Sequence, residues 1–107
     1  MEGALRLLGL GARARNLVIG VTGVRAQLQR GDLKGVVLAA DASPRTQDKV
    51  ARLARARGIP VWRGPAADRL GAVLGRPAVQ AVGVADPALA RGLAKAFGGV
   101  SGNDANS

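Results

Sequence analysis

Apolar positions along the chain alternate between helical spacing and short unbroken runs, which predicts helices separated by strands. The expected helices cover residues 2–14, 21–30, 44–57, 66–74 and 87–97. The expected strands cover residues 16–19, 36–40, 59–63 and 79–84. Strands joined through helices imply crossover connections. The predicted fold class is therefore α/β, with a three-layer α/β/α sandwich built on about four strands.

Local signals place several of the element boundaries. Ser43 before Pro44, and Asp86 before Pro87, are typical helix starts, because the side chain caps the helix and proline fits its first turn. Gly31 can end the second helix. The run at 36–40 is apolar throughout, as in a strand buried on both faces. Four leucines form the expected core face of the first helix: Leu5, Leu7, Leu8 and Leu10.

The 107 residues suit one domain, which we place at 1–97. Residues 98–107 are rich in Gly, Ser and Asn, and we expect a disordered tail there. Trp62 and Phe97 are the only aromatic residues, so the core must consist of aliphatic side chains. No apolar run is long enough for a membrane span, and we expect a cytoplasmic protein. The basic segment 1–15 also suits an organelle transit peptide, but its leucines favour a folded helix.

Positive charge predominates, with 16 basic residues against 7 acidic ones and a formal net charge of +9. A GC-rich genome would account for Arg in place of Lys but not for the shortage of acids. An excess of positive charge favours polyanionic partners such as nucleic acids. Arg45, Lys49 and Arg52 recur at i, i+4 and i+7 and form one stripe of the third helix. That stripe fits a solvated helix face and an RNA contact equally well.

Catalytic and metal-binding chemistry has little support. The chain has no Cys and no His, which excludes disulfides, thiolate nucleophiles, histidine bases and the usual zinc sites. Ser43 follows a buried strand, but no base is at hand to activate it, so we expect it to cap a helix while Asp41 supports the turn. We expect no enzyme activity, no catalytic residues, no metal and no cofactor.

Residues 20–23, at the start of the second helix, include two glycines and a hydroxyl group: Gly20, Val21, Thr22 and Gly23. Backbone N–H groups at a helix start bind anions, and small residues let a bulky ligand backbone approach closely. A plain turn with a small-residue cap would have the same composition. From the residues alone, an anion site and a simple turn are equally good interpretations.

Motifs at 16–20, 28–31, 36–43, 58–61 and 70–75 resemble, in order and spacing, the kink-turn-binding ribosomal proteins of the L7Ae and L30e type. The resemblance covers residues 4–95 and is strongest to the small bacterial YlxQ-type members. It implies an α/β/α sandwich with a mixed four-stranded sheet. It also implies RNA binding through the start of the second helix and the loop before the last strand. The residues that it assigns to RNA are Gly20, Val21, Thr22, Gly23, Arg25, Ala26, Arg76, Pro77, Ala78 and Val79.

The resemblance also indicates which contacts this chain lacks. Kink-turn-binding relatives open the second helix with Gly-x-Asn-Glu and have a Lys three residues later. Here Thr22, Gly23 and Ala26 stand at the Asn, Glu and Lys positions. Each lost polar contact costs about 1–3 kcal/mol, which predicts reduced kink-turn specificity. Arg25 would supply a replacement charge on a different face, and Val79 would cover an extruded nucleotide.

The expected function is RNA binding, to ribosomal or other structured RNA within a ribonucleoprotein. Ribosomal or translation-factor proteins are further expected partners, and no membrane is involved. The alternative is a protein-interaction module of the same fold that has lost RNA recognition. Its motivation is the loss of polar side chains at positions 22, 23 and 26.

Overall fold

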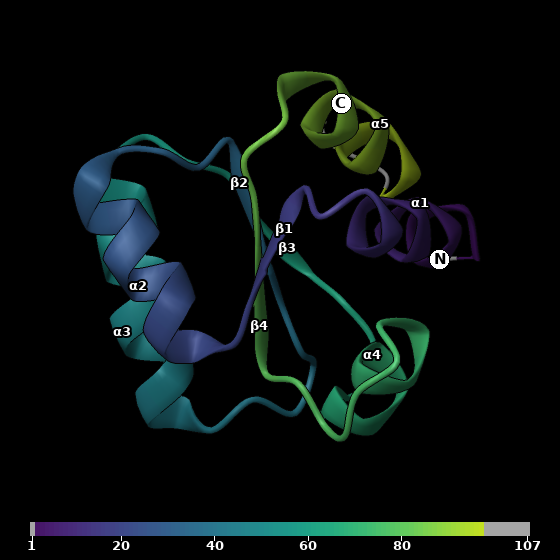
Figure 1. Cartoon of the computed structure of the whole chain (residues 1–107). Coiled ribbons are helices and arrows are strands. Elements are labelled where there is room, and N and C mark those ends of the chain that lie inside the picture. The colour runs from purple at the N-terminus through teal and green to yellow at the C-terminus, as the bar shows by residue number, and fades with distance from the viewer. Residues whose placement is uncertain (1, 98–107) are drawn as a thin grey trace, which may run out of the picture.

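The computed structural model describes residues 2–97, and the predicted tail at 98–107 lies outside this range. The described chain alternates helices and strands, as the apolar pattern predicts (Figure 1). The elements in order are α1 (Glu2–Arg13), β1 (Leu17–Ile19), α2 (Val21–Arg30), β2 (Gly35–Leu38), α3 (Pro44–Ala56), β3 (Val61–Arg63), α4 (Ala67–Val73), β4 (Ala81–Val84) and α5 (Pro87–Ala96). Strands β2, β3 and β4 are each shorter than the expected strands at 36–40, 59–63 and 79–84.

The four strands form one mixed sheet in the order β1-β4-β2-β3. Strand β4 pairs antiparallel with β1 and β2, and β2 pairs parallel with β3. Helices α2 and α3 cover one face of the sheet, and α1, α4 and α5 cover the other (Figure 1). This arrangement confirms the three-layer α/β/α sandwich and the mixed sheet.

Two aliphatic clusters fill the spaces on either side of the sheet. The central strands β2 and β4 are buried at each of their positions, as the apolar run predicts for a strand covered on both faces. Their side chains alternate, so Val36 packs with α2 and α3 whereas Val37 packs with the other three helices. Among the described residues no charged side chain is buried. Each charged residue within 2–97 therefore keeps some contact with solvent.

The prediction for Leu10 is wrong. Leu5 and Leu8 are buried and Leu7 is half-buried, but Leu10 is 53% exposed. Two positions beyond Leu8 correspond to a rotation of about 200° around an α-helix, so Leu10 points away from the core. Its apolar surface faces outward at the end of α1.

The predicted helix caps are confirmed. The hydroxyl oxygen of Ser43 accepts a hydrogen bond from the backbone N–H of Thr46 at 3.1 Å. The carboxylate of Asp86 accepts one from the N–H of Leu89 at 2.7 Å. Gly31 ends α2 in the left-handed region, with φ of 79°. Helix starts and stops in this chain are thus encoded locally.

Asp41 caps α4, a helix distant in sequence, and not the turn in which it lies. Its Oδ1 atom accepts a hydrogen bond from the N–H of Ala67, the first residue of α4, at 2.7 Å. The residue that precedes α4, Ala66, has no side chain able to cap the helix. Asp41 thereby ties the end of β2 to the start of α4.

Candidate nucleic-acid interface

Gly20 forms the junction between β1 and α2. Its φ of 104° and ψ of 153° lie in a region that residues with a side chain rarely adopt. Its N–H donates to the carbonyl of Ala81 at 2.9 Å, and its carbonyl accepts from Val24 at 3.0 Å. No side chain caps α2, and no acidic residue lies in its first turn. The first backbone N–H groups of α2 are therefore available to an anionic ligand.

The start of α2 and the loop before β4 line one groove of about 390 Å³. Ile19, Gly20 and Val21 form one wall, and residues 76–80 form the other. The structure thus brings together the two segments that the family resemblance assigns to RNA. We call this groove the α2 groove.

The loop side of the α2 groove is held by backbone hydrogen bonds. The N–H of Arg76 donates to the carbonyl of Gly71 at 2.8 Å, and that of Val79 to the carbonyl of Ala67 at 2.9 Å. Arg76, Pro77 and Ala78 are exposed. Val79 is only 6% exposed and packs in the core, so it offers little surface to a ligand. The accessible part of this wall comes from residues 76–78.

Gln80 is a lining residue that the sequence analysis missed. Its side chain is exposed, and its Oε1 atom accepts a hydrogen bond from the N–H of Ser43 at 3.2 Å. This bond connects the α2 groove to the start of α3. The sequence signal for it is a polar residue placed between Val79 and the buried strand β4.

The three positions where this chain departs from the kink-turn-binding pattern differ in their surroundings. Thr22 and Ala26 are exposed on α2, where polar side chains would reach solvent or a ligand. Gly23 is half-buried, and a Cβ atom at this position would lie 2.9 Å from Cγ1 of Val18. A long side chain at position 23 therefore requires Val18 to move. At positions 22 and 26, by contrast, the packing would allow a longer polar side chain.

Arg25 lies apart from the α2 groove. It lines a second groove, between α2 and α3, together with Lys49 and Arg52. Its Nε atom is buried and has no hydrogen-bond partner among the described residues. Arg52 pairs with Asp48 at 3.1 Å, whereas Arg45 is exposed at the start of α3. The structure thus joins Arg25 to the basic stripe of α3 and not to Arg76.

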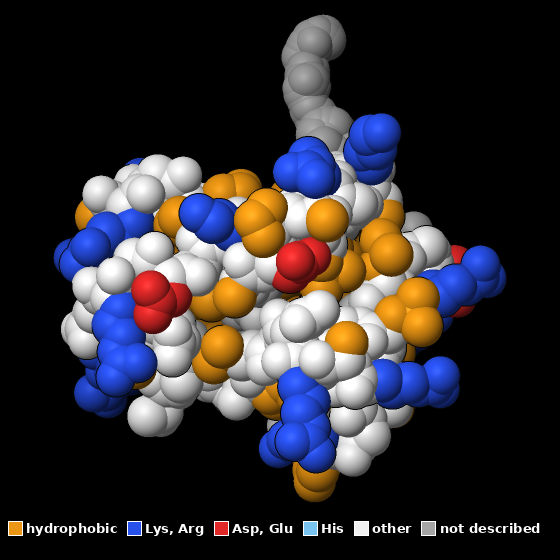
Figure 2. Space-filling view, turned by 45° about the horizontal axis from the view of Figure 1, so that its top comes forward, with side chains coloured by type: hydrophobic (Ala, Val, Ile, Leu, Met, Phe, Trp, Pro, Cys, Tyr) orange, Lys and Arg blue, Asp and Glu red, His pale blue; other side chains and the backbone are white. Residues whose placement is uncertain are grey.

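Basic side chains are spread over the face of the molecule that Figure 2 shows, including the region of α2 and α3 at the left. The basic side chains within the bounds of these two helices are Arg25, Arg30, Arg45, Lys49, Arg52 and Arg55. Asp48 is the acidic residue among them. Charge alone therefore does not single out the α2 groove. That groove is distinguished by its uncapped helix start and by the loop opposite.

Asp41 and Asp86 are engaged at helix starts. Within residues 2–97 no group of His, Cys, Asp or Glu side chains is placed to hold a metal ion. Ser43, Asp41 and Asp86 each bond to a backbone N–H at a helix start. No helix in this part of the chain is long and apolar enough to cross a membrane.

Comparison with known proteins identifies relatives of this fold. A solved structure of a protein with unknown function from Bacillus halodurans C is 34% identical, with a TM-score of 0.85, over 88% of this chain and 95% of that one. A Giardia lamblia 15.5kD RNA binding protein shares the fold at 24% identity and a TM-score of 0.74, over 90% of this chain and 82% of that one. No curated protein matches the sequence. The model of the ribosomal protein L7Ae/L30e/S12e/Gadd45 family matches residues 4–93, and the chain belongs to this family.

Proposed function

We propose that this protein binds structured RNA, ribosomal or other, through the α2 groove. The observation that carries the proposal is the pairing of the uncapped start of α2 with the exposed loop at 76–78. Family membership supports RNA binding, and the Giardia relative that shares the fold is described as an RNA binding protein. The proposed setting is a cytoplasmic ribonucleoprotein that includes ribosomal or translation-factor proteins, as for a YlxQ-type member.

The groove favours contacts to the RNA backbone over contacts to base edges. Backbone N–H groups at the start of α2 and the guanidinium of Arg76 suit phosphate oxygens. Contacts to phosphate fix the position of a protein on RNA but carry no sequence information. With Thr22, Gly23 and Ala26 in place of longer polar residues, the protein has few side chains with which to read a base pair.

Arg76→Glu is expected to weaken RNA binding at least tenfold, because it places a carboxylate opposite the phosphates that the groove binds. The measurement is the Kd for a kink-turn hairpin and for ribosomal RNA fragments, by fluorescence anisotropy at two salt concentrations. Arg6→Glu, at an exposed position of α1, makes the same charge change outside the groove. An equal loss in both variants, or no binding by the unmodified protein at low salt, would refute the proposal.

Kink-turn selectivity is expected to be weak. Replacing the tandem sheared G·A pairs of the hairpin by Watson–Crick pairs should raise Kd by less than fivefold, because positions 22, 23 and 26 lack the side chains that would bond to those bases. The same anisotropy assay measures this in direct competition between the two hairpins. A loss of a hundredfold or more would show that the protein recognises the G·A pairs by other groups.

The second candidate is a protein-interaction module that has lost RNA recognition. The exposed, uncharged side chains of Thr22 and Ala26 favour it, since the kink-turn-binding pattern has longer polar side chains at these positions. Pull-down of the tagged protein before and after nuclease treatment separates the two functions. Partners that persist after nuclease favour the module, and partners that are lost favour RNA binding.

A further inference from the structure

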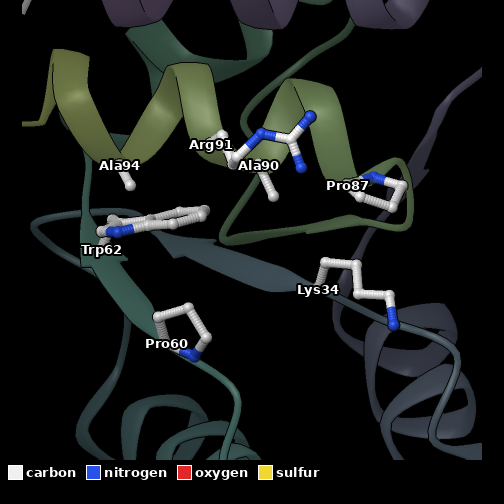
Figure 3. A pocket seen from close by; sticks show the side chains of 7 residues that line it. All are labelled: Lys34, Pro60, Trp62, Pro87, Ala90, Arg91 and Ala94. Atoms are coloured by element: carbon white, nitrogen blue, oxygen red, sulfur yellow. The ribbon is translucent and has the colours of Figure 1, made fainter.

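Figure 3 shows a third groove, whose volume is about 300 Å³. It lies at the opposite end of the sheet from the α2 groove. In the β2–β4 pair Leu38 faces Ala81, whose carbonyl bonds to Gly20, and Gly35 faces Val84 at the other end. Lys34, next to Gly35, lines the third groove. The two grooves are therefore separated by the length of the central strands.

Trp62 provides a fixed aromatic surface in this groove. It lies on the edge strand β3 and is half-buried, so part of the indole remains accessible. The ring passes over Gly35, where a Cβ atom would overlap it. It also stacks on Phe97, with ring centroids 6.0 Å apart and planes 15° from parallel. A ring held in this way loses little conformational freedom when a ligand packs on it.

The polar groups around the indole are cationic. Lys34 and Arg91 line the groove from the start of β2 and from α5, and both are exposed (Figure 3). Neither forms an ion pair with any described residue. No acidic residue lines the groove, and the neighbouring Asp86 carboxylate is engaged in capping α5. The rest of the lining is apolar and includes Pro60.

A groove lined by an aromatic ring and by two cations without ion-pair partners among residues 2–97 matches one class of ligand closely. An apolar peptide would leave Lys34 and Arg91 without anionic partners. An acidic peptide would leave the indole without a flat ring to stack on it. A nucleotide offers both a flat ring for stacking and a phosphate for the cations. Stacking of bases on aromatic residues along a basic groove is the usual way that proteins hold single-stranded nucleic acid, and it accepts any base.

We propose that this groove binds a nucleotide of single-stranded RNA, with the base against Trp62 and a phosphate against Lys34 and Arg91. The proposal rests on RNA being the partner of the α2 groove. It adds a second contact, for an unpaired segment, at the far end of the sheet. The protein would then hold a structured element and a single-stranded extension at separate surfaces.

The fluorescence of Trp62 tests this directly, because the chain has one Trp and no Tyr. Titration of the full chain with hexauridylate or hexaadenylate at low salt should quench the emission in a saturable way. Lys34→Glu and Arg91→Glu leave the indole in place and should each raise the half-saturation concentration at least fivefold. Lys95→Glu, also exposed on α5 but outside the groove, should raise it less than twofold.

Several results would overturn the proposal. One is an absence of saturable quenching, and another is a rise in half-saturation concentration for the Lys95 variant as large as for the Lys34 and Arg91 variants. The others are quenching by heparin equal to that by hexauridylate, and binding of uridine monophosphate as tight as that of hexauridylate. Far-UV circular dichroism confirms that each variant is folded. If the hairpin assay keeps its dependence on Arg76 while Trp62 does not respond, the third groove is refuted and the α2 groove stands. If neither assay shows binding, both proposals fail.

Discussion

Replacing Gly71 by alanine is expected to destabilise the protein by about 3 kcal/mol, because the added methyl group meets backbone and not a movable side chain. For a domain of this size that loss lowers Tm by about 12–24 °C. Gly71 lies in α4, where a Cβ atom would overlap the carbonyl oxygen of Pro77. The same atom would lie 2.7 Å from the carbonyl carbon of Pro77 and 2.9 Å from the carbonyl oxygen of Arg76.

The effect of this substitution extends to the α2 groove. The carbonyl of Gly71 accepts the hydrogen bond from Arg76 that holds the loop against α4. To make room for a methyl group the loop must move outward as a unit, and Arg76, Pro77 and Ala78 move with it. We therefore expect Gly71→Ala to weaken RNA binding in the folded protein as well as to lower its stability.

Gly9→Ala is the matched control, since it makes the same chemical change in a helix with space for it. The nearest atom to a Cβ at Gly9 is the carbonyl oxygen of Val73, at 3.7 Å. Removing a glycine from a helix interior should stabilise the protein by about 0.5–1 kcal/mol. Urea and thermal unfolding followed by circular dichroism measure both variants. If Gly71→Ala unfolds like the unmodified protein, the contact between α4 and the loop is not as described.

Most of the fold can be predicted from the sequence because its signals are local. Ser43 with Pro44, Asp86 with Pro87, and Gly31 mark helix ends through bonds made within a few residues. Leu10 is an exception, because its exposed position follows from the helical period and not from its leucine neighbours.

The proposed binding surfaces depend on contacts between distant segments, which residue spacing does not reveal. The family resemblance identified both walls of the α2 groove, but not that Val79 is buried or that Gln80 bonds to Ser43. The resemblance assigns Arg25 to RNA as a charge on a different face of α2, and spacing alone does not show that this face lies beside α3. The groove at Trp62 requires β3 to lie next to β2 and beneath α5, which no local pattern indicates.

The second large effect is expected for Gly35→Ala, which should cost about 3 kcal/mol and shift the emission of Trp62 to longer wavelength. A Cβ atom at Gly35 would overlap the Cη2 and Cζ3 atoms of the indole and lie 3.3 Å from Cζ2. Gly35 lies in the buried strand β2, so its backbone is fixed by pairing with β4. The indole must therefore tilt away from the sheet, towards water and out of its stack on Phe97.

Gly83→Ala separates this displacement from a general loss of packing. Gly83 is buried in β4, and a Cβ atom there would lie 2.6 Å from a terminal methyl of Leu33, away from Trp62. It should lower stability and leave the emission maximum unchanged. A red shift in both variants would mean that Trp62 responds to any weakening of the sheet. A red shift confined to Gly35→Ala, with loss of hexauridylate quenching, would show that Gly35 sets the indole in the position that a stacked base requires.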